Sequence, residues 1–423
     1  MTSTAVVISL ILVAVALAQL PLVRIFGRAL KKMEPWQDRG AGSQEELPHA
    51  AMILCLRGPD PFLAETLRAA AAQEYPHYRL FVIIDHPDDP AWNTVAETLG
   101  DPGPEHVTLV ALENRRETCS LKCSSLVQVI ESLDSSYEIV ALLDADTVPH
   151  RSWLAELAGP LADPAVGATT GNRWYAPRQP SWGALVRYLW NAAAVVQMYC
   201  YGIPWGGTLA VKLRELRQSG LLDRWAHGFC EDTMLFAELK QRGQRIVFVP
   251  SLIMLNRESC HVSGFFNWVR RQLLTARLYH PGWPAVVLHG LLTTLVLFAG
   301  LLGFAASVFW GTSTETTWLA TGLLVYLTVM HGMLVFLERR VHAVFAARSV
   351  TTSWITTRTW LWMILAIPLT QFLYAAALLS VLFVRRIHWR GITYQIDGPR
   401  DIRMIEYRPF QLKHETLARG TSL

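Results

Sequence analysis

The sequence has few charged residues for its length. Only 17% of its 423 residues are Asp, Glu, Lys or Arg, whereas 52% are hydrophobic, and this balance excludes an ordinary soluble protein. The net charge of +4 is small, and much of the basic excess lies beside apolar runs, where attraction to lipid explains it. We therefore expect no nucleic-acid partner.

Cysteine is also scarce, and its spacing matches no metal site. The six cysteines are scattered, and Cys119 and Cys123 have no second pair or histidine partner that would complete a zinc pattern. Reduced cysteines are expected, as in a cytoplasmic domain.

Four runs contain no Asp, Glu, Lys or Arg at all. A charge at the centre of a membrane helix costs roughly 2.5–3.5 kcal/mol, and each run has about the length that crosses a hydrocarbon core. The alternative is a buried core helix in a soluble domain. The four predicted membrane helices lie within residues 5–23, 285–310, 317–337 and 360–384.

The first apolar run could also be a cleaved signal peptide, because residues 16–18 imitate a signal-peptidase site. However, no basic residue precedes this run, whereas Arg24, Arg28, Lys31 and Lys32 follow it. This charge bias predicts an uncleaved anchor over residues 1–32, with the amino terminus outside and the next domain in the cytoplasm.

The side of the carboxyl-terminal tail is ambiguous. Three more membrane helices within residues 283–386 would leave the tail, 387–423, outside, yet Arg385, Arg386 and Arg390 favour the cytoplasm. We follow the helix count. The chain is thus predicted to be a multi-pass protein of a bacterial inner membrane with its large domain in the cytoplasm.

A polar linker at 33–48 precedes a predicted α/β domain at 49–262. Strand and helix patterns alternate here, which favours a parallel, Rossmann-like sheet with helices on both faces. An amphipathic helix over 263–282 then precedes the membrane runs, and we expect it to lie at the membrane interface. The predicted strands cover residues 50–56, 80–84, 107–112 and 137–143.

Two acids end the strand predicted at 137–143. Side chains alternate along a strand, so Asp144 and Asp146 point to the same side, at the edge where open α/β sheets bind ligands. Two carboxylates there can hold Mg²⁺ or Mn²⁺, which in turn can bind a diphosphate. The alternative is a pair of ordinary turn acids.

Three further acids are candidates for the same edge. Asp85 closes the strand at 80–84 and could contact a nucleotide, or it could be a turn acid. Glu231 and Asp232 open a helix predicted over 232–242. Asp232 could accept a proton from a hydroxyl as a general base, or it could simply cap that helix.

Three arginines lie on the predicted interfacial helix. Arg270 and Arg277 are seven residues apart and share a helical face. Together with Arg271 they could clamp a diphosphate leaving group. The alternative is attraction to lipid headgroups.

The order of these features resembles the inverting nucleotide-sugar glycosyltransferases that include cellulose and chitin synthases, and within them ceramide glucosyltransferase. The likeness runs from the amino-terminal anchor to about residue 396. The segments that carry it are Leu-Arg-Gly-Pro-Asp-Pro at 56–61, Glu-Tyr-Pro-His-Tyr at 74–78, Asp-Asp-Pro-Ala at 88–91, Asp-Ala-Asp at 144–146, Glu-Asp at 231–232 and Ile-His-Trp-Arg-Gly-Ile-Thr-Tyr at 387–394.

The resemblance implies a set of roles for these residues. Asp144 and Asp146 would hold the donor diphosphate through Mg²⁺ or Mn²⁺. Asp232, beside Glu231, would be the catalytic base, so that the acceptor hydroxyl attacks the anomeric carbon opposite the departing diphosphate and inverts it. The implied donor-binding residues are Arg57, Asp85, Asp144, Arg270, Arg271 and Arg277.

The sequence departs from this family at one motif. The family's catalytic set usually ends with Gln or Arg, two residues, then Arg-Trp, but the matching segment here has Leu274 and Thr275 in place of Arg-Trp. Position 274 shares a helical face with Arg270 and Arg277. Our hypothesis is that these two arginines replace the missing one.

The sequence therefore predicts a membrane enzyme with a cytoplasmic catalytic domain, which transfers one sugar from a nucleotide donor such as a UDP-hexose to a lipid hydroxyl. Ceramide, a sterol-like lipid, a hopanoid and diacylglycerol all fit as acceptors. Two alternatives stay open: a processive polysaccharide synthase, and a catalytically inactive membrane scaffold with the same fold.

Overall fold

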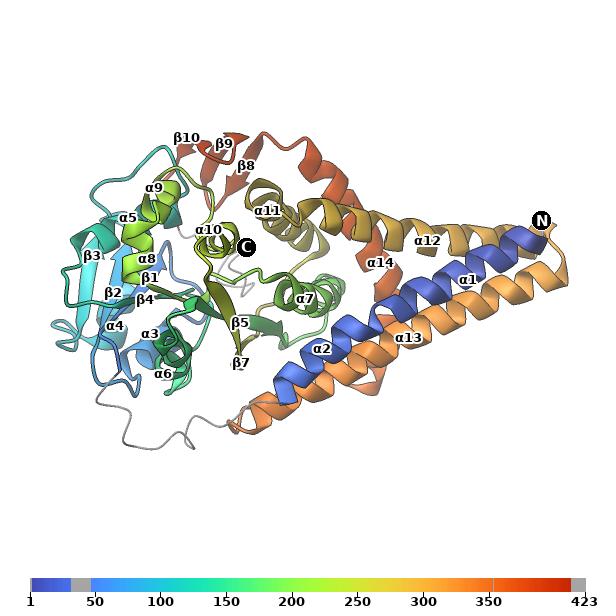
Figure 1. Ribbon diagram of the computed structural model, residues 1–423, viewed down its shortest axis with the longest axis horizontal. Coiled ribbons are helices and arrows are strands. Elements are labelled where there is room, and N and C mark those ends of the chain that lie inside the picture. Colours follow the sequence, from blue (N-terminus) through green and yellow to red (C-terminus); the bar gives the residue numbers. More distant parts are fainter. Residues whose placement is uncertain (1, 32–46, 353, 412–423) are drawn as a thin grey trace.

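The computed structural model describes residues 2–31, 47–352 and 354–411. It has an α/β domain from which a bundle of long helices projects (Figure 1). The predicted linker, 33–48, lies outside the described residues except for its last two, and so do residues 412–423 of the predicted tail.

The domain is built on a seven-stranded sheet with the strand order β3-β2-β1-β4-β6-β5-β7. The first four strands in sequence are parallel to one another, whereas β6 is antiparallel to both β4 and β5. This confirms the predicted α/β class. The strands are β1 (Ala50–Leu56), β2 (Tyr78–Ile84), β3 (Val107–Ala111), β4 (Ile139–Leu143), β5 (Val166–Tyr175), β6 (Thr208–Lys212) and β7 (Arg245–Asn256).

Both faces of this sheet are covered. Successive side chains of β1 enter different cores, with Met52 on one face and Ile53 on the other, as strand alternation requires. The core around Ile53 continues into the long helices, which fixes the domain against them. The helices of the domain are α3 (Leu63–Ala71), α4 (Ala91–Leu99), α5 (Leu121–Ser132), α6 (Trp153–Ala158), α7 (Trp182–Tyr201), α8 (Leu213–Gln218), α9 (Leu221–Ala226), α10 (Leu235–Gln241) and α11 (Val262–Tyr279).

The helix predicted over 232–242 is shorter than expected, because α10 begins at Leu235. Asp232 lies in the turn before it. Its side chain accepts hydrogen bonds from the backbone N–H groups of Gly206 and Thr233, so it does not cap α10.

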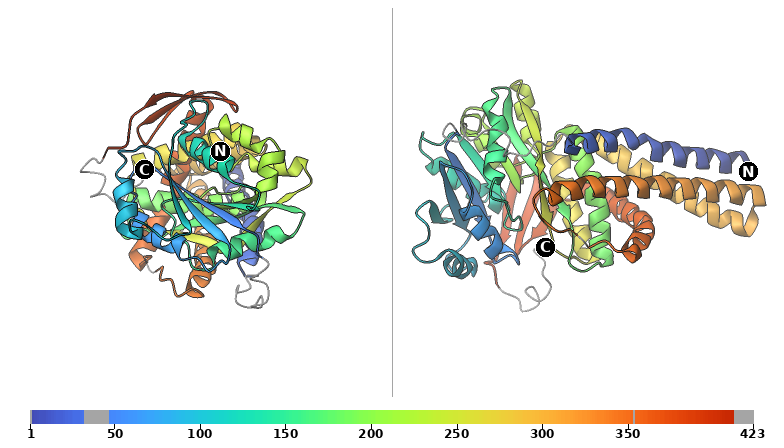
Figure 2. Two further views of the ribbon diagram at one scale, coloured as in Figure 1. Left: turned by 90° about the vertical axis from the view of Figure 1, so that its left-hand side faces the viewer. Right: turned by 90° about the horizontal axis from the view of Figure 1, so that it is seen from below.

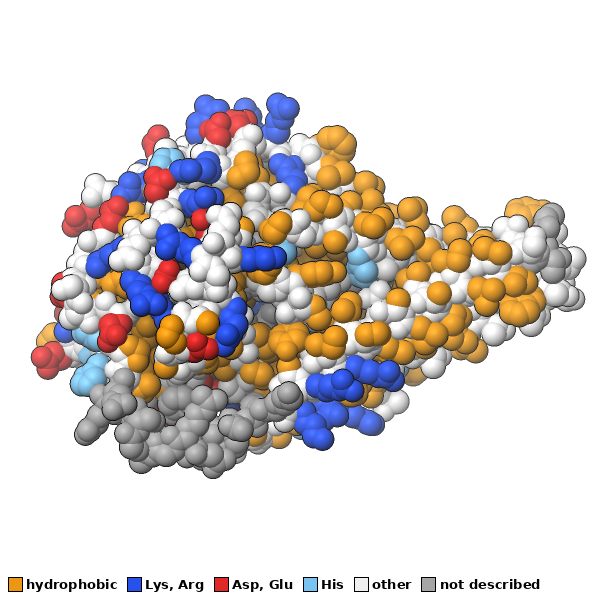
Figure 3. Space-filling view, in the orientation of Figure 1, with side chains coloured by type: hydrophobic (Ala, Val, Ile, Leu, Met, Phe, Trp, Pro, Cys, Tyr) orange, Lys and Arg blue, Asp and Glu red, His pale blue; other side chains and the backbone are white. Residues whose placement is uncertain are grey.

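In the part of the chain that the structure describes, four helical segments are long and apolar enough to cross a membrane: 3–31, α12 (Trp283–Trp310), α13 (Ser313–Ala346) and α14 (Thr357–Leu382). The first comprises α1 (Thr2–Ala18) and α2 (Leu20–Lys31). Helices α1, α12 and α13 run side by side away from the domain (Figures 1 and 2). Hydrophobic side chains cover their surface, whereas charged side chains gather on the domain (Figure 3).

Helix α14 is oriented differently from the other three apolar segments. It crosses the base of the projecting bundle, and both of its ends lie beside the α/β domain (Figures 1 and 2). The chain then forms a three-stranded antiparallel sheet of β8 (Arg386–Trp389), β9 (Ile392–Gly398) and β10 (Asp401–Tyr407).

This second sheet contacts the α/β domain directly, because Arg390 pairs with Asp60 and donates to the backbone carbonyl of Arg57. The described part of the tail therefore packs against the α/β domain. The side of a membrane on which the tail lies stays a prediction, because the helix count and the charge bias of the three arginines give opposite answers.

Candidate active site

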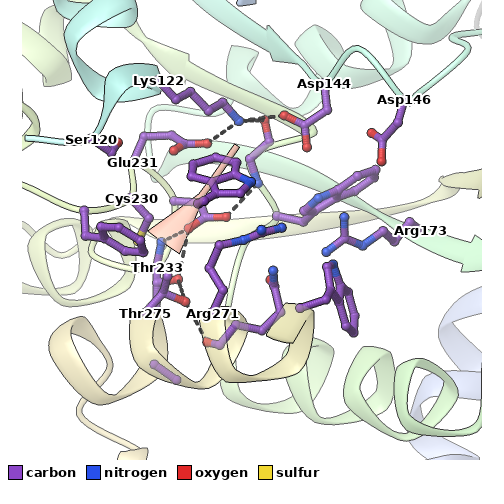
Figure 4. A pocket seen from close by; sticks show the side chains of 18 of the residues that line it. Ser120, Lys122, Asp144, Asp146, Arg173, Cys230, Glu231, Thr233, Arg271 and Thr275 are labelled. Atoms are coloured by element: carbon purple, nitrogen blue, oxygen red, sulfur yellow. Dashed lines mark hydrogen bonds and ion pairs between the residues drawn. The ribbon is translucent and has the colours of Figure 1, made fainter. Parts of the chain in front are cut away.

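A cavity of about 280 Å³ opens at the carboxyl ends of β1 and β4. Its walls come from the sheet edge, from α7 and α11, and from the turn between β8 and β9 (Figure 4). Its charged lining residues are Arg57, Asp60, Lys122, Asp144, Asp146, Arg173, Glu231, Asp232, Glu258, Arg271 and Arg390.

The strand-end acids lie in this cavity as predicted, but in different electrostatic surroundings. Burial, followed by the negative charges of Glu258 and Asp144, raises the pKa of Asp146 to about 6. Burial alone would also raise the pKa of Asp144, but the Lys122 ammonium holds it below its usual range. Asp146 also accepts a hydrogen bond from the Asn256 amide at 3.1 Å.

Lys122 is the central cation of the site. It lies in the first turn of α5, whose amino end is capped by the Ser120 side chain. Its Nζ lies 2.6 Å from Asp144 Oδ1 and 2.6 Å from Glu231 Oε1. Burial would lower the pKa of Lys122, but these two carboxylates raise it well above its ordinary value, so the side chain carries a positive charge.

Glu231 and Asp232 are adjacent but differently placed. The Glu231 carboxylate is buried against Lys122, and burial raises its pKa. Asp232 is half-buried and lines the cavity. Its Oδ2 accepts from Gly206 N at 2.9 Å, and its Oδ1 accepts from the Thr233 hydroxyl at 2.9 Å. Asp232 is therefore the better placed of the two acids to meet a ligand.

Gly206 and Gly207 allow these groups to converge. A Cβ atom added to Gly206 would collide with the Glu231 carboxylate, and one added to Gly207 would collide with Asp144 and with the Trp205 ring. The glycine pair between α7 and β6 therefore lets the backbone pass beside the carboxylates, leaving the Gly206 N–H free to bond Asp232.

Two of the four arginines that line the cavity, Arg173 and Arg271, stack on tryptophan rings. Arg173, on β5, stacks over the rings of Trp205 and Trp268 at 5.2 and 5.1 Å. Arg271, on α11, stacks over Trp389 at 4.5 Å. Burial, together with the positive charges of neighbouring arginines, lowers the pKa of Arg271 to about 10.

The structure does not bring Arg270 and Arg277 into this cavity. Arg277 donates hydrogen bonds to the backbone carbonyls of Val381, Leu382 and Val384 at the end of α14. Arg270 stacks on Phe266 of its own helix. Both arginines lie on α11 but neither lines the cavity, so the hypothesis that they replace the missing one does not fit the structure.

Asp85 is more enclosed than expected. It pairs with Arg57 and accepts a hydrogen bond from the Tyr407 hydroxyl at 3.0 Å. Burial raises its pKa, although Arg57 opposes this effect. Arg57 reaches the cavity wall, whereas Asp85 lies behind it, beneath β10.

The residues present fit a divalent cation only in part. Asp144 and Asp146 offer carboxylate oxygens. The negative charges of Glu258 and Asp146 repel each other, and a bound cation would offset this repulsion. Within the described residues, no group of three or more His, Cys, Asp or Glu side chains is arranged to hold a metal. Proteins nevertheless commonly bind Mg²⁺ through only one or two carboxylates when substrate phosphates supply other ligands.

Sequence reasoning missed Lys122, Arg173 and Arg390. Arg390 lies within the tail segment 387–394 on which the family resemblance partly rests, so a signal for it existed. Lys122 and Arg173 stand in no motif that was recognised, and only the fold brings them to the strand-end acids.

Fold and cavity together define an α/β protein with a highly charged cavity at the carboxyl edge of its sheet. The model of glycosyl transferase family 21 matches residues 6–402, so the chain belongs to this family, the ceramide glucosyltransferase family. The predicted resemblance is thus confirmed.

Among the solved structures to which the chain is similar are the following two. A mannosyltransferase from Pyrobaculum calidifontis, in complex with GDP-Man and Mn²⁺, is 19% identical, with 89% of this chain and 99% of that chain covered and a TM-score of 0.45. Glucosyl-3-phosphoglycerate synthase from Mycobacterium tuberculosis, in complex with Mn²⁺, UDP and phosphoglyceric acid, is 15% identical, with 59% and 86% covered and a TM-score of 0.38.

Proposed function

We propose that this glycosyltransferase moves a single hexose from a nucleotide-sugar donor, such as a UDP-hexose, to a lipid hydroxyl, with inversion of the anomeric carbon. One observation carries the proposal: Asp232 lines the same cavity as the strand-end acids Asp144 and Asp146. The proposed base and the proposed diphosphate site therefore lie in one cavity.

In the proposed reaction, Asp232 takes the proton of the acceptor hydroxyl. The acceptor oxygen forms a bond to the anomeric carbon while the bond from that carbon to the diphosphate oxygen breaks. The hydrogen bonds from Gly206 and Thr233 hold the Asp232 carboxylate in place. General base catalysis of this kind contributes about 10²–10⁴-fold to the rate.

The leaving diphosphate needs positive charge around it. Lys122, Arg173, Arg271 and Arg390 line the cavity and supply that charge. We propose that Mg²⁺ or Mn²⁺, held by Asp144 and Asp146, adds to it. Arg271 and Arg390, rather than Arg270 and Arg277, are the arginines that compensate for the missing Arg-Trp motif.

A lipid acceptor is supported by the position of the cavity. Its walls include Val286 at the start of α12 and Tyr374 within α14, and both helices are apolar enough for a membrane. An acceptor carried by the bilayer could thus present its headgroup to Asp232. We place the catalytic domain in the cytoplasm, with α11 at the membrane interface.

The alternatives make different predictions. A processive synthase would elongate a sugar chain on one acceptor, and an inactive scaffold would show no turnover. Purified protein in lipid vesicles is incubated with Mn²⁺ and a panel of labelled nucleotide sugars, and labelled lipids are identified by mass spectrometry. We expect one lipid carrying one sugar; polymeric products, or no product with any donor, would overturn the proposal.

Asp232→Asn tests the assignment of the base. We expect kcat to fall at least about 100-fold while the donor KM changes little. The matched control is Asp223→Asn, because Asp223 lies on α9 with 59% of its side chain exposed. An Asp232→Asn enzyme with ordinary kcat would contradict the assignment.

A further inference from the structure

Helix α14 exposes a stripe of large apolar side chains along its whole length. Their spacing of four and seven residues places them on one helical face, while the opposite face packs against α7, α11 and α12. Soluble proteins rarely leave so long an apolar surface in water, so this face has a partner. The apolar stripe consists of Leu361, Leu365, Phe372 and Leu379 of α14 and of Phe383 directly after it, which are 50–82% exposed.

The direction of α14 indicates what that partner is. Helices α1, α12 and α13 run away from the α/β domain, and α14 crosses their base (Figures 1 and 2). Length does not decide its position, because 26 residues make a helix of about 39 Å, which can either cross a hydrocarbon core or lie along it. If the other three helices cross a bilayer, a helix that crosses their base runs along the bilayer surface.

Both ends of α14 are tied to the α/β domain. Before the helix begins, Arg348 pairs with Glu156 of α6 at 2.8 Å. Where the helix ends, Arg277 of α11 donates to the backbone carbonyl of Leu382 at 3.1 Å. A membrane-spanning helix that starts beside the domain would carry its other end to the far side of the bilayer, away from these partners.

Basic side chains mark a layer of lipid headgroups at the level of α14. Arg24, Arg28 and Lys31 are exposed on α2, and Gly27 between them packs closely against the Phe336 ring of α13. Lysine and arginine side chains gather over these helices where the bundle meets the domain (Figure 3), at the same level of the bundle as α14 (Figure 1). Anionic headgroups attract such clusters.

The ends of α14 carry residues of the same kind. Arg358 lies in the first turn and stacks over the Trp362 ring at 5.3 Å, and the exposed Arg385 and Arg386 follow the helix. A helix that lies in the membrane surface combines an apolar face with basic and aromatic residues at headgroup level.

We propose that α14 lies in the plane of the membrane, on the surface next to the α/β domain, with its apolar stripe among the acyl chains just below the headgroups. The segment 3–31, α12 and α13 cross the bilayer, and α14 does not. Three crossings place the tail on the side of the domain, which is also the side that Arg385, Arg386 and Arg390 favour. This inference goes beyond the proposed function, because it holds whether or not a sugar is transferred.

The side of the tail is tested with a full-length variant that carries two cleavage sites for a sequence-specific protease. One site is inserted after Gly103, in the exposed loop between α4 and β3, and the other after residue 411. Protease is added to sealed vesicles, and vesicles opened with detergent show total cleavage. We expect each chain to be cut at both sites or at neither, whatever the orientation of the vesicles. Chains cut only once would overturn the proposal.

The depth of α14 is tested with a fluorophore on single introduced cysteines. Leu361→Cys, Phe372→Cys and Phe383→Cys sample the two ends and the middle of the apolar stripe. The vesicles contain lipids with a quenching nitroxide either near the headgroup or near the end of the acyl chain. We expect the shallow nitroxide to quench more strongly than the deep one at all three positions.

A matched control calibrates this measurement. Leu295 lies near the middle of α12 and is 67% exposed, so Leu295→Cys should be quenched more strongly by the deep nitroxide. The unsubstituted protein, whose Cys55 and Cys200 are only partly buried, supplies the background. Deep quenching at Phe372→Cys with shallow quenching at both ends would mean that α14 enters the core of the bilayer. Weak quenching by both lipids would mean that a protein covers the stripe, and either result would overturn the proposal.

Discussion

Replacing Lys122 with methionine tests the electrostatic centre of the cavity. The side chain of Lys122 is 19% exposed, and that of its partner Glu231 is 5% exposed. Methionine keeps the apolar stem but removes the charge, which leaves Glu231 and Asp144 facing each other without the ammonium between them.

The size of the effect follows from this burial. Breaking a buried ion pair by removing one partner typically costs about 3–5 kcal/mol. Asp144 is 27% exposed, and Glu231, whose pKa burial already raises, can become protonated. We therefore expect the lower end, about 3 kcal/mol, or a fall in Tm of roughly 6–12 °C for a domain of this size.

The pH dependence has a definite sign. In the variant the folded-state pKa of Glu231 is raised further above its unfolded value, so the folded state binds more protons than the unfolded state. Stability should then fall as pH rises through that folded pKa, and the defect relative to wild type should be smaller in acid than at neutral pH.

The assay is thermal unfolding of the detergent-solubilised protein at several pH values, with and without Mn²⁺. Mn²⁺ should raise the Tm of Lys122→Met more than that of the wild type, because a bound cation replaces the lost charge. Lys240→Met, at an exposed position on α10, is the control and should stay within about 0.5 kcal/mol of wild type. A Lys122→Met protein as stable as this control would refute the reasoning.

Other predictions concern the same cavity and the contact of the α/β domain with the long helices. Arg390→Ala should raise the donor KM about ten-fold by removing a cation from the proposed diphosphate site, and an unchanged KM would contradict a role of Arg390 in donor binding. Although burial alone would raise the pKa of Glu156, its hydrogen bond with His150 and the charge of Arg348 lower it to about 2. Glu156→Gln should thus cost about 3 kcal/mol at neutral pH, a defect that shrinks in unfolding experiments as pH falls from about 4.5 towards 2. Removal of divalent cations with EDTA should abolish turnover, and Mn²⁺ should restore it; activity that survives EDTA would exclude a metal-dependent step.

The predictable part of the site is the part encoded locally. An apolar strand followed by acids specifies both the strand and the position of its acids, and Asp144 and Asp146 accordingly lie together in the lining of one cavity. The pairs that shape their charge are not local. Lys122 is 22 residues from Asp144, and Arg390 is 330 residues from Asp60. No period of helix or strand predicts such contacts.

The arginines of α11 show where helical periodicity stops being informative. Seven-residue spacing correctly placed Arg270 and Arg277 on one face, but periodicity does not say what that face meets. The carbonyl groups at the end of α14 lack helical partners, and Arg277 bonds them. Arg271, one position further around the helix, is the residue that reaches the cavity.

The orientation of α14 explains how the tail reaches the cavity. Counting assumes that every apolar run of sufficient length crosses the bilayer, so four runs must place the tail opposite the domain. Helix α14 instead packs across the base of the other three, and Arg277 fixes its carboxyl end to α11. Both ends then lie beside the domain, which allows Arg390 to enter the cavity. In this chain the tail thus brings Arg390 into the lining of the same cavity as Arg271 of α11.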